Sequence, residues 1–151
     1  MQERLVLNEI TVQYKPRYNT CQDTITSSEK AYQHAIRFFN EDTLQMQEQF
    51  VVLYLNQSNR VIGGYTHSFG GITSTIADIR IIFSIALKVL ATGIILCHNH
   101  PSGRIIPSST DKVLTKKFKE AGKVMDITNV DHLIVSYTKE FYSFADEGLL
   151  S

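Results

Sequence analysis

The sequence predicts an α/β fold in which a β-sheet lies between layers of helices. Segments with apolar residues at helical spacing interleave along the chain with short apolar runs that are typical of strands. The chain has 151 residues, of which 43% are hydrophobic and 20% are charged, as in an ordinary globular domain with a substantial core. Because helices and strands alternate rather than forming separate blocks, a three-layer α/β arrangement follows.

The first elements predict a short N-terminal extension followed by the domain. Apolar residues alternate over residues 5–14, which favours a strand, and a polar linker follows over residues 15–28. We therefore divide the chain into an N-terminal strand and linker (residues 1–27) and one domain (residues 28–151). Thr26 and Glu29 have the spacing of a capping box, which predicts a helix reaching about Phe39.

The next elements form a predicted hairpin. Residues 48–56 are expected to be a strand, residues 57–59 a turn and residues 60–66 the partner strand. The glycines that follow predict a flexible, tightly turning connection, with His67 as a surface loop histidine. These glycines are Gly63, Gly64, Gly70 and Gly71.

The second half of the domain begins with a helix capped by Asp78, whose apolar face extends to Leu90. A buried strand, another helix and two strands joined by a turn at residues 138–139 are expected after it. Their predicted ranges are 94–97, 109–124, 131–136 and 141–144.

Two histidines at the end of the buried strand have the spacing of metal ligands. His98 and His100 are two residues apart, so on an extended strand both side chains point the same way. The chain then turns through a loop containing Pro101, Gly103 and Pro107, and a helix start could return Asp111 to the same point. Two imidazoles and one carboxylate suit zinc, and a set of three leaves a fourth position for water, as in catalytic sites.

Each of these features also has an ordinary structural explanation. A His-x-His pair is often structural, and Ser108 with Asp111 resembles a capping box whose members only bind backbone N–H groups. Cys97, at the end of the apolar run, is interpreted as a buried thiol rather than a ligand. The conjunction of paired histidines, a turning loop and a Ser/Asp helix start favours the metal site.

These residues resemble a known family. The stretch from His98 to Gly103, with Ser108 and Asp111, matches the pattern His-x-His, seven residues, Ser, two residues, Asp of the JAMM (JAB/MPN-type) zinc metalloproteases. The resemblance is to their RadC-like branch, long labelled as DNA repair proteins, and it extends over about residues 25–148 through segments 49–56 and 131–135. It implies the JAMM/MPN-like fold, a mixed β-sheet with helices packed around it.

The resemblance also implies roles. His98, His100 and Asp111 would hold Zn²⁺, and zinc-activated water would attack a peptide or isopeptide bond. Glu48 matches the family's general base, in preference to Glu41 and Asp42, which precede the strand. Ser108 would donate a hydrogen bond to the oxyanion. From the residues alone, Glu48 is an ordinary solvated carboxylate at a strand start, and Ser108 is a plain N-cap.

Other expectations concern compartment and partners. Two cysteines and no recognisable signal or membrane-spanning stretch favour a cytoplasmic protein. The expected substrate is a peptide or protein, whose identity the sequence does not specify. The alternatives are a DNA-associated binding module, which the formal net charge of zero does not encourage, and a JAMM-like scaffold that is catalytically silent. No helix-hairpin-helix segment of the kind carried by full-length RadC-like proteins precedes Ser28, so a short form is expected.

Overall fold

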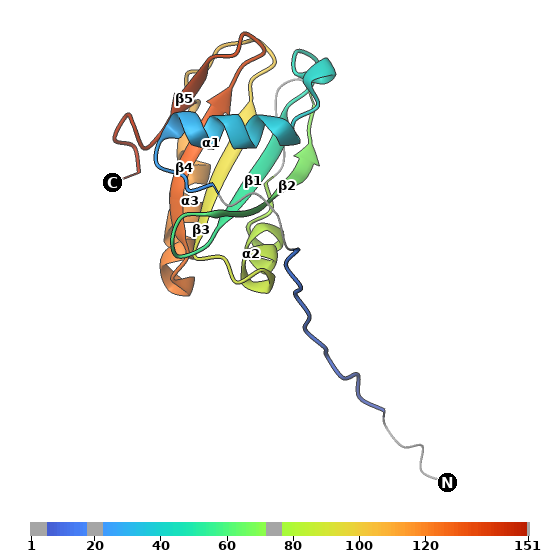
Figure 1. Cartoon of the computed structure of the whole chain (residues 1–151). Helices are drawn as coiled ribbons and strands as arrows, with labels where there is room; N and C mark the ends of the chain where they lie inside the picture. The colour runs from blue at the N-terminus through green and yellow to red at the C-terminus, as the bar shows by residue number, and fades with distance from the viewer. Residues whose placement is uncertain (1–5, 18–22, 72–76, 151) are drawn as a thin grey trace.

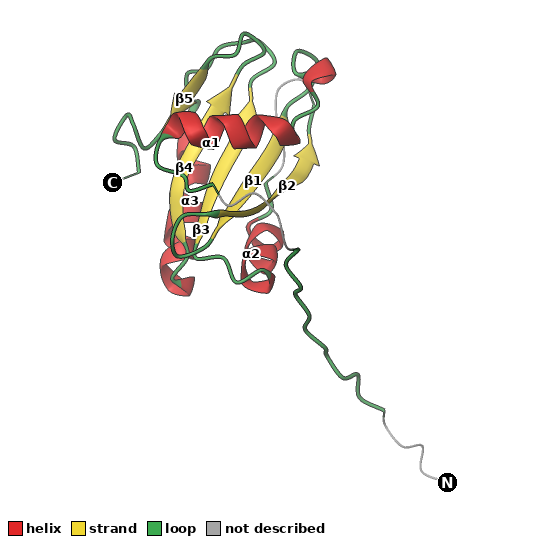
Figure 2. Ribbon diagram, viewed as in Figure 1, coloured by secondary structure: helices red, strands yellow, loops and turns green. Residues whose placement is uncertain are grey.

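A computed structural model describes residues 6–17, 23–71 and 77–150 of the chain. Its core is a five-stranded β-sheet with helices on both faces, which confirms the predicted three-layer α/β arrangement (Figures 1 and 2). The elements, in chain order, are α1 (Ser28–Ala35), η1 (Ile36–Phe38), η2 (Glu41–Thr43), β1 (Gln49–Leu55), β2 (Val61–Phe69), α2 (Ile79–Lys88), β3 (Gly93–Asn99), α3 (Ser109–Met125), β4 (Thr128–Val135) and β5 (Phe141–Ser143).

The sheet is mixed, with the strand order β2-β1-β3-β4-β5. All neighbours are antiparallel except β3 and β4, which are parallel. A parallel pair needs a crossover connection, and α3 supplies it. This crossover places the start of α3 beside the carboxyl end of β3, the position from which a helix residue can reach the side chains that follow the strand.

The two faces of the sheet bury separate apolar clusters. Helix α1 packs on one face, in front of the sheet in Figure 1, and α2 and α3 pack on the other. The strand residues alternate between the two clusters, as the period of two requires. Facing α1 are Val51, Leu53, Leu55, Ile95, Cys97, Leu133 and Val135. Facing α2 and α3 are Phe50, Val52, Tyr54, Ile94 and Leu96.

The strand predicted over residues 5–14 is wrong for the part that the structure describes. Residues 6–14 are extended but pair with no other strand, and Figure 1 shows them leading away from the domain. Alternating apolar residues form a strand only when a partner binds the backbone groups and covers one face. Here Val6, Leu7 and Ile10 are each more than 80% exposed. Residues 18–22, including Cys21, lie outside the described part.

Two details of the helices differ from the predictions. Helix α1 begins one residue later than the capping box implied, because Ser27 rather than Thr26 accepts the Lys30 N–H at 3.2 Å. Asp78 caps α2 as expected, but the helix ends at Lys88 with Val89 as its C-cap. Leu90 lies beyond the helix, is 75% exposed and has a positive φ of 59°, so it does not extend the apolar face.

Strand β2 is longer than predicted and contains His67, which is therefore not a loop residue. Gly64 lies within the strand, where the Phe38 ring covers it so closely that an added Cβ would lie 2.3 Å from a ring carbon. The glycine allows this close approach and does not mark a turn. The His67 Nε2 accepts the Asp78 N–H at 2.9 Å, which links β2 to the start of α2.

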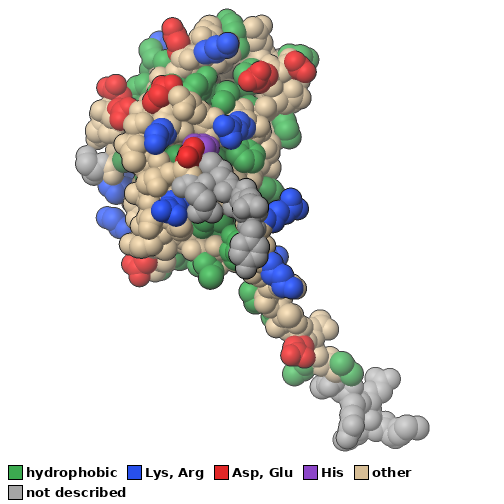
Figure 3. All heavy atoms as spheres, viewed as in Figure 1, with side chains coloured by type: hydrophobic (Ala, Val, Ile, Leu, Met, Phe, Trp, Pro, Cys, Tyr) green, Lys and Arg blue, Asp and Glu red, His purple; other side chains and the backbone are tan. Residues whose placement is uncertain are grey.

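The surface offers two further observations. Within the described ranges, no helix has both the length and the apolar composition needed to cross a bilayer. On the face drawn in Figure 3, basic and acidic side chains are interspersed rather than gathered into areas of one sign.

Candidate metal centre

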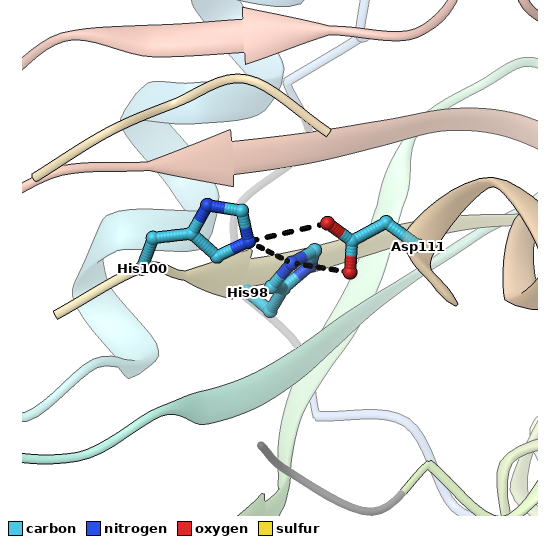
Figure 4. A group of neighbouring side chains, drawn as sticks. All are labelled: His98, His100 and Asp111. Carbon is cyan, nitrogen blue, oxygen red and sulfur yellow. Dashed lines mark hydrogen bonds and ion pairs between the residues drawn. The ribbon is translucent and has the colours of Figure 1, made fainter. Parts of the chain in front are cut away.

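The side chains of His98, His100 and Asp111 converge at the end of β3 (Figure 4). His98 is the penultimate residue of the strand and His100 follows its last residue, so both point to the α3 side of the sheet, as predicted. The two Nε2 atoms are 3.1 Å apart. Asp111 Oδ1 lies 3.2 Å from His98 Nε2, and Asp111 Oδ2 lies 3.2 Å from His100 Nε2.

The start of α3 delivers the carboxylate. Ser108 is the N-cap: its hydroxyl oxygen accepts the Asp111 N–H at 3.1 Å, and Asp111 Oδ2 accepts the Ser108 N–H at 2.8 Å. The capping box expected as the ordinary alternative is therefore present, and it does not compete with the cluster. It fixes the carboxylate in the orientation that faces the histidines.

The loop between β3 and α3 is held by a close backbone approach. Gly103 has a φ of 84°, a conformation that side chains other than glycine rarely adopt. A Cβ there would lie 2.9 Å from the Tyr137 ring. The Gly103 N–H also donates to the His100 carbonyl at 2.9 Å, which closes the turn directly after the second histidine.

The arrangement fits a zinc ion. Two ligands of tetrahedral zinc, each about 2.0–2.1 Å from the metal, lie about 3.3–3.4 Å apart. The distances of 3.1 and 3.2 Å among His98 Nε2, His100 Nε2 and the Asp111 oxygens are close to that spacing. Two imidazoles and one carboxylate are also a donor set that zinc accepts with a coordination position left open.

The charges within the cluster support one another. Burial alone would raise the pKa of Asp111, but hydrogen bonds from His100 and His98 outweigh it and hold the pKa well below its usual range. The hydrogen bond to Asp111 raises the pKa of His100 against the opposing effect of burial, and the negative charge of Glu48 adds to this increase. The carboxylate is thus ionised at neutral pH, as a metal ligand must be.

A buried chain of hydrogen bonds sets the tautomer of His98. The Thr115 hydroxyl donates to the Asp111 carbonyl at 2.7 Å, so its oxygen accepts from His132 Nδ1 at 2.6 Å. Burial, followed by the charge of His98, lowers the pKa of His132 well below its ordinary value, so this ring is neutral and its Nε2 is an acceptor. It therefore accepts the His98 Nδ1–H at 2.8 Å. When the His98 ring is neutral, this bond leaves its Nε2 with a lone pair directed at the cluster.

A single hydrogen bond orients the His100 ring in the same way. Its Nδ1–H donates to the Arg104 carbonyl at 2.6 Å. A carbonyl can only accept, so this bond leaves the His100 Nε2 without a proton of its own when the ring is neutral. Hydrogen bonds of this kind to the outer ring nitrogen are the usual means of orienting metal-binding histidines.

Glu48 lies at the same edge of the sheet. It lies two residues before Phe50, and Phe50 is the antiparallel partner of His98. Both backbone polar groups of Glu48 are bound by the two glycines that directly follow β2: its N–H donates to the Gly71 carbonyl at 3.0 Å, and its carbonyl accepts the Gly70 N–H at 2.7 Å. Glu48 is half-buried, and its negative charge contributes to raising the pKa of His100.

Three further residues complete the description: Cys97 lies away from the cluster, and the contacts of His132 and Thr115 were not predicted from the sequence. Cys97 is buried on the opposite face of the sheet, as predicted, and burial raises the pKa of its thiol. The hydrogen bond between His132 and His98 was not predicted from the sequence. Thr115 was missed; the available signal was a hydroxyl one helical turn after Asp111 on the buried face of α3.

Comparisons with known proteins agree on one family. The family described as RadC-like JAB domain matches residues 25–149. A UPF0758 protein of Flavobacterium johnsoniae is 54% identical over 102 residues, which cover 68% of this chain and 44% of that protein. A UPF0758 protein of Porphyromonas gingivalis is 41% identical over 128 residues, covering 85% and 55%. One of Streptococcus pyogenes is 44% identical over 104 residues, covering 69% and 46%. The chain spans about half the length of these curated relatives.

Proposed function

Because the chain belongs to the RadC-like JAB domain family, we propose that it is a zinc-dependent hydrolase that cleaves a peptide or isopeptide bond. The mixed sheet with helices on both faces is consistent with the JAB/MPN-like fold. The observation that carries the proposal is the convergence of two imidazole Nε2 atoms and one carboxylate, each held by bonds to its other polar atoms.

In this proposal His98, His100 and Asp111 hold the zinc ion. Bound there, zinc would supply Lewis acidity, which lowers the pKa of water and polarises a carbonyl oxygen. The three residues come from one strand end and one helix start, so little conformational freedom would be lost on binding.

Glu48 is the proposed general base. Its half-buried carboxylate lies at the metal-site edge of the sheet and influences the pKa of His100. In the reaction it would accept a proton from the attacking water and pass that proton to the leaving nitrogen. Such a residue contributes about 10²- to 10⁴-fold to the rate.

Ser108 is the proposed oxyanion donor. Its hydroxyl oxygen already accepts the Asp111 N–H, which leaves the hydroxyl hydrogen to donate to a developing negative charge. The capping geometry fixes the direction of that donor before the substrate arrives, and removing one such donor typically costs about 10²- to 10³-fold in rate.

Two variants test the proposal. The purified chain is loaded with zinc, and its metal content and cleavage of a fluorogenic peptide pool and of a lysine-linked isopeptide pool are measured. Glu48→Gln should retain zinc and lose at least about 100-fold in rate. Asp111→Ala should lose both zinc and activity, because the ion keeps only two ligands.

Lys112→Ala, next to Asp111 but exposed, is the matched control and should keep both properties. A wild-type protein that binds zinc but cleaves neither pool would contradict the proposal and favour a silent scaffold. Full activity of Glu48→Gln would contradict the role given to Glu48.

A further inference from the structure

Asn99, the residue between the two histidines, makes an unusually complete set of contacts. It ends β3 with its side chain on the face opposite to His98, and it is fully buried. Its Oδ1 accepts the Gln49 N–H at 2.6 Å. Its Nδ2 donates to the Gln47 carbonyl at 3.0 Å and to the Leu44 carbonyl at 2.8 Å. Both amide hydrogens and the amide oxygen are therefore used.

Two of these bonds enclose Glu48. The Gln47 carbonyl belongs to the peptide group before Glu48, and the Gln49 N–H belongs to the peptide group after it. Peptide groups are planar, so fixing both planes fixes the two rotatable backbone angles of the residue between them. Glu48 itself also binds Gly70 and Gly71 through its backbone. Every backbone polar group from the Gln47 carbonyl to the Gln49 N–H therefore has a hydrogen-bond partner.

The neighbouring Gln49 reinforces the same segment. Its side chain is fully buried and binds the Asn40 backbone at both the N–H, at 2.8 Å, and the carbonyl, at 3.0 Å. The Gln49 amide also donates to the Thr43 hydroxyl at 3.2 Å. The residues that lead into Glu48 are thus tied to the sheet by two buried amide side chains.

We propose that Asn99 is a positioning residue that sets the distance between the Glu48 carboxylate and the metal ligands. The inference rests on the proposed function, since it concerns that same site. Asn99 is covalently joined to His98 and His100, and its side chain binds the backbone on both sides of Glu48. The ligands and the base therefore move as one unit, although they are about 50 residues apart in sequence. Displacing a reacting group by about 1 Å can cost about 100-fold in rate.

The experiment compares zinc-loaded Asn99→Ser with the wild type on whichever fluorogenic peptide or isopeptide the wild type cleaves. The rate constant kcat should fall by about 10- to 100-fold, with KM changed by no more than about threefold and zinc affinity unchanged. Asn129→Ser is the matched control, because Asn129 is also a buried asparagine but lies far from Glu48 along the sheet. Its kcat should equal that of the wild type.

A double variant separates a positioning role from general destabilisation. If Asn99 acts through Glu48, then Glu48→Gln with Asn99→Ser should be no more than about twofold slower than Glu48→Gln alone. Full multiplication of the two losses, or a loss of zinc affinity in Asn99→Ser that matches its loss of rate, would overturn the inference.

Amide hydrogen exchange gives a readout that does not depend on activity. In Asn99→Ser the Gln49 amide should exchange at least about tenfold faster, while the Glu48 amide, bound to Gly71, should keep most of its protection. Unchanged protection of Gln49 would overturn the inference even in a protein that cleaves nothing. If Asn99→Ser does not fold, Asn99→Asp keeps the size and the acceptor: its Gln49 amide should stay protected and its kcat should still fall, and wild-type kcat would overturn the inference.

Discussion

Two buried asparagines at opposite ends of the sheet differ in their hydrogen bonding. Asn99, at the end of β3, makes three hydrogen bonds. Asn129 lies in β4, opposite Ile94 near the start of β3, and is only 9% exposed. Within the described residues, neither polar atom of its side-chain amide has a hydrogen-bond partner. An unpartnered buried amide costs free energy, whereas a partnered one stabilises the fold. The amide of the asparagine beside the candidate metal centre is therefore fully paired, and the amide of the asparagine at the other end of the sheet is not.

The largest expected effect comes from removing the partnered amide. Asn99→Leu should lower the free energy of unfolding by about 3 kcal/mol or more, because the Gln49 N–H and the Gln47 and Leu44 carbonyls stay buried without a partner. Urea denaturation of the metal-free protein measures the change. A loss below about 1 kcal/mol would show that these groups find water or new partners, and the contrast between the two asparagines would then disappear.

A smaller effect is expected at His132, which extends the polar network to β4. His132→Phe preserves the stacking on Phe144, where the ring centroids are 4.7 Å apart, but removes the acceptor for His98 Nδ1. Zinc affinity should fall by about 10- to 100-fold, because the orientation of the ligand ring is no longer fixed. Competition with a chromophoric chelator measures it.

His132→Gln offers an amide oxygen as an acceptor and is the control for that measurement; it should lose less affinity than His132→Phe. Equal affinities for the wild type and His132→Phe would show that the hydrogen-bond chain through Thr115 does not orient His98.

The smallest effect is expected at the unpartnered asparagine, and its sign is opposite. Asn129→Leu removes an amide that gains no hydrogen bond from being buried, so the protein should become more stable by up to about 1 kcal/mol. The same denaturation measurement applies. Destabilisation by more than about 1 kcal/mol would mean that Asn129 has partners, such as ordered water, and that the two asparagines do not differ in their pairing.

The positions of the candidate ligands could be predicted because local patterns encode each of them. Strand alternation orients His98 and His100 together, and the capping box fixes where α3 begins and hence where Asp111 points. Most strands and helices were also predicted within a few residues, since their apolar periodicity is strong.

The supporting residues could not be predicted, because their partners are distant in sequence. Asn99 binds residues 50 and 55 positions away, and His132 reaches His98 only after α3 has brought β4 alongside β3. The strand expected over residues 5–14 failed for a related reason. Alternation describes one strand, and pairing requires a second that the local sequence does not specify.

The first two turns of α3 have a consequence for engineering this protein. Asp111 faces the two histidines of the centre, and Thr115, about 6 Å further along the helix axis, holds the third imidazole in place. Because one rigid rod makes both contacts, sliding it by a single residue would withdraw the carboxylate and the hydroxyl together. Apart from Gly103, the loop over residues 101–107 can therefore be redesigned in composition, but a change in its length that shifts the helix would move Asp111 away from the two histidines and Thr115 away from His132 at once.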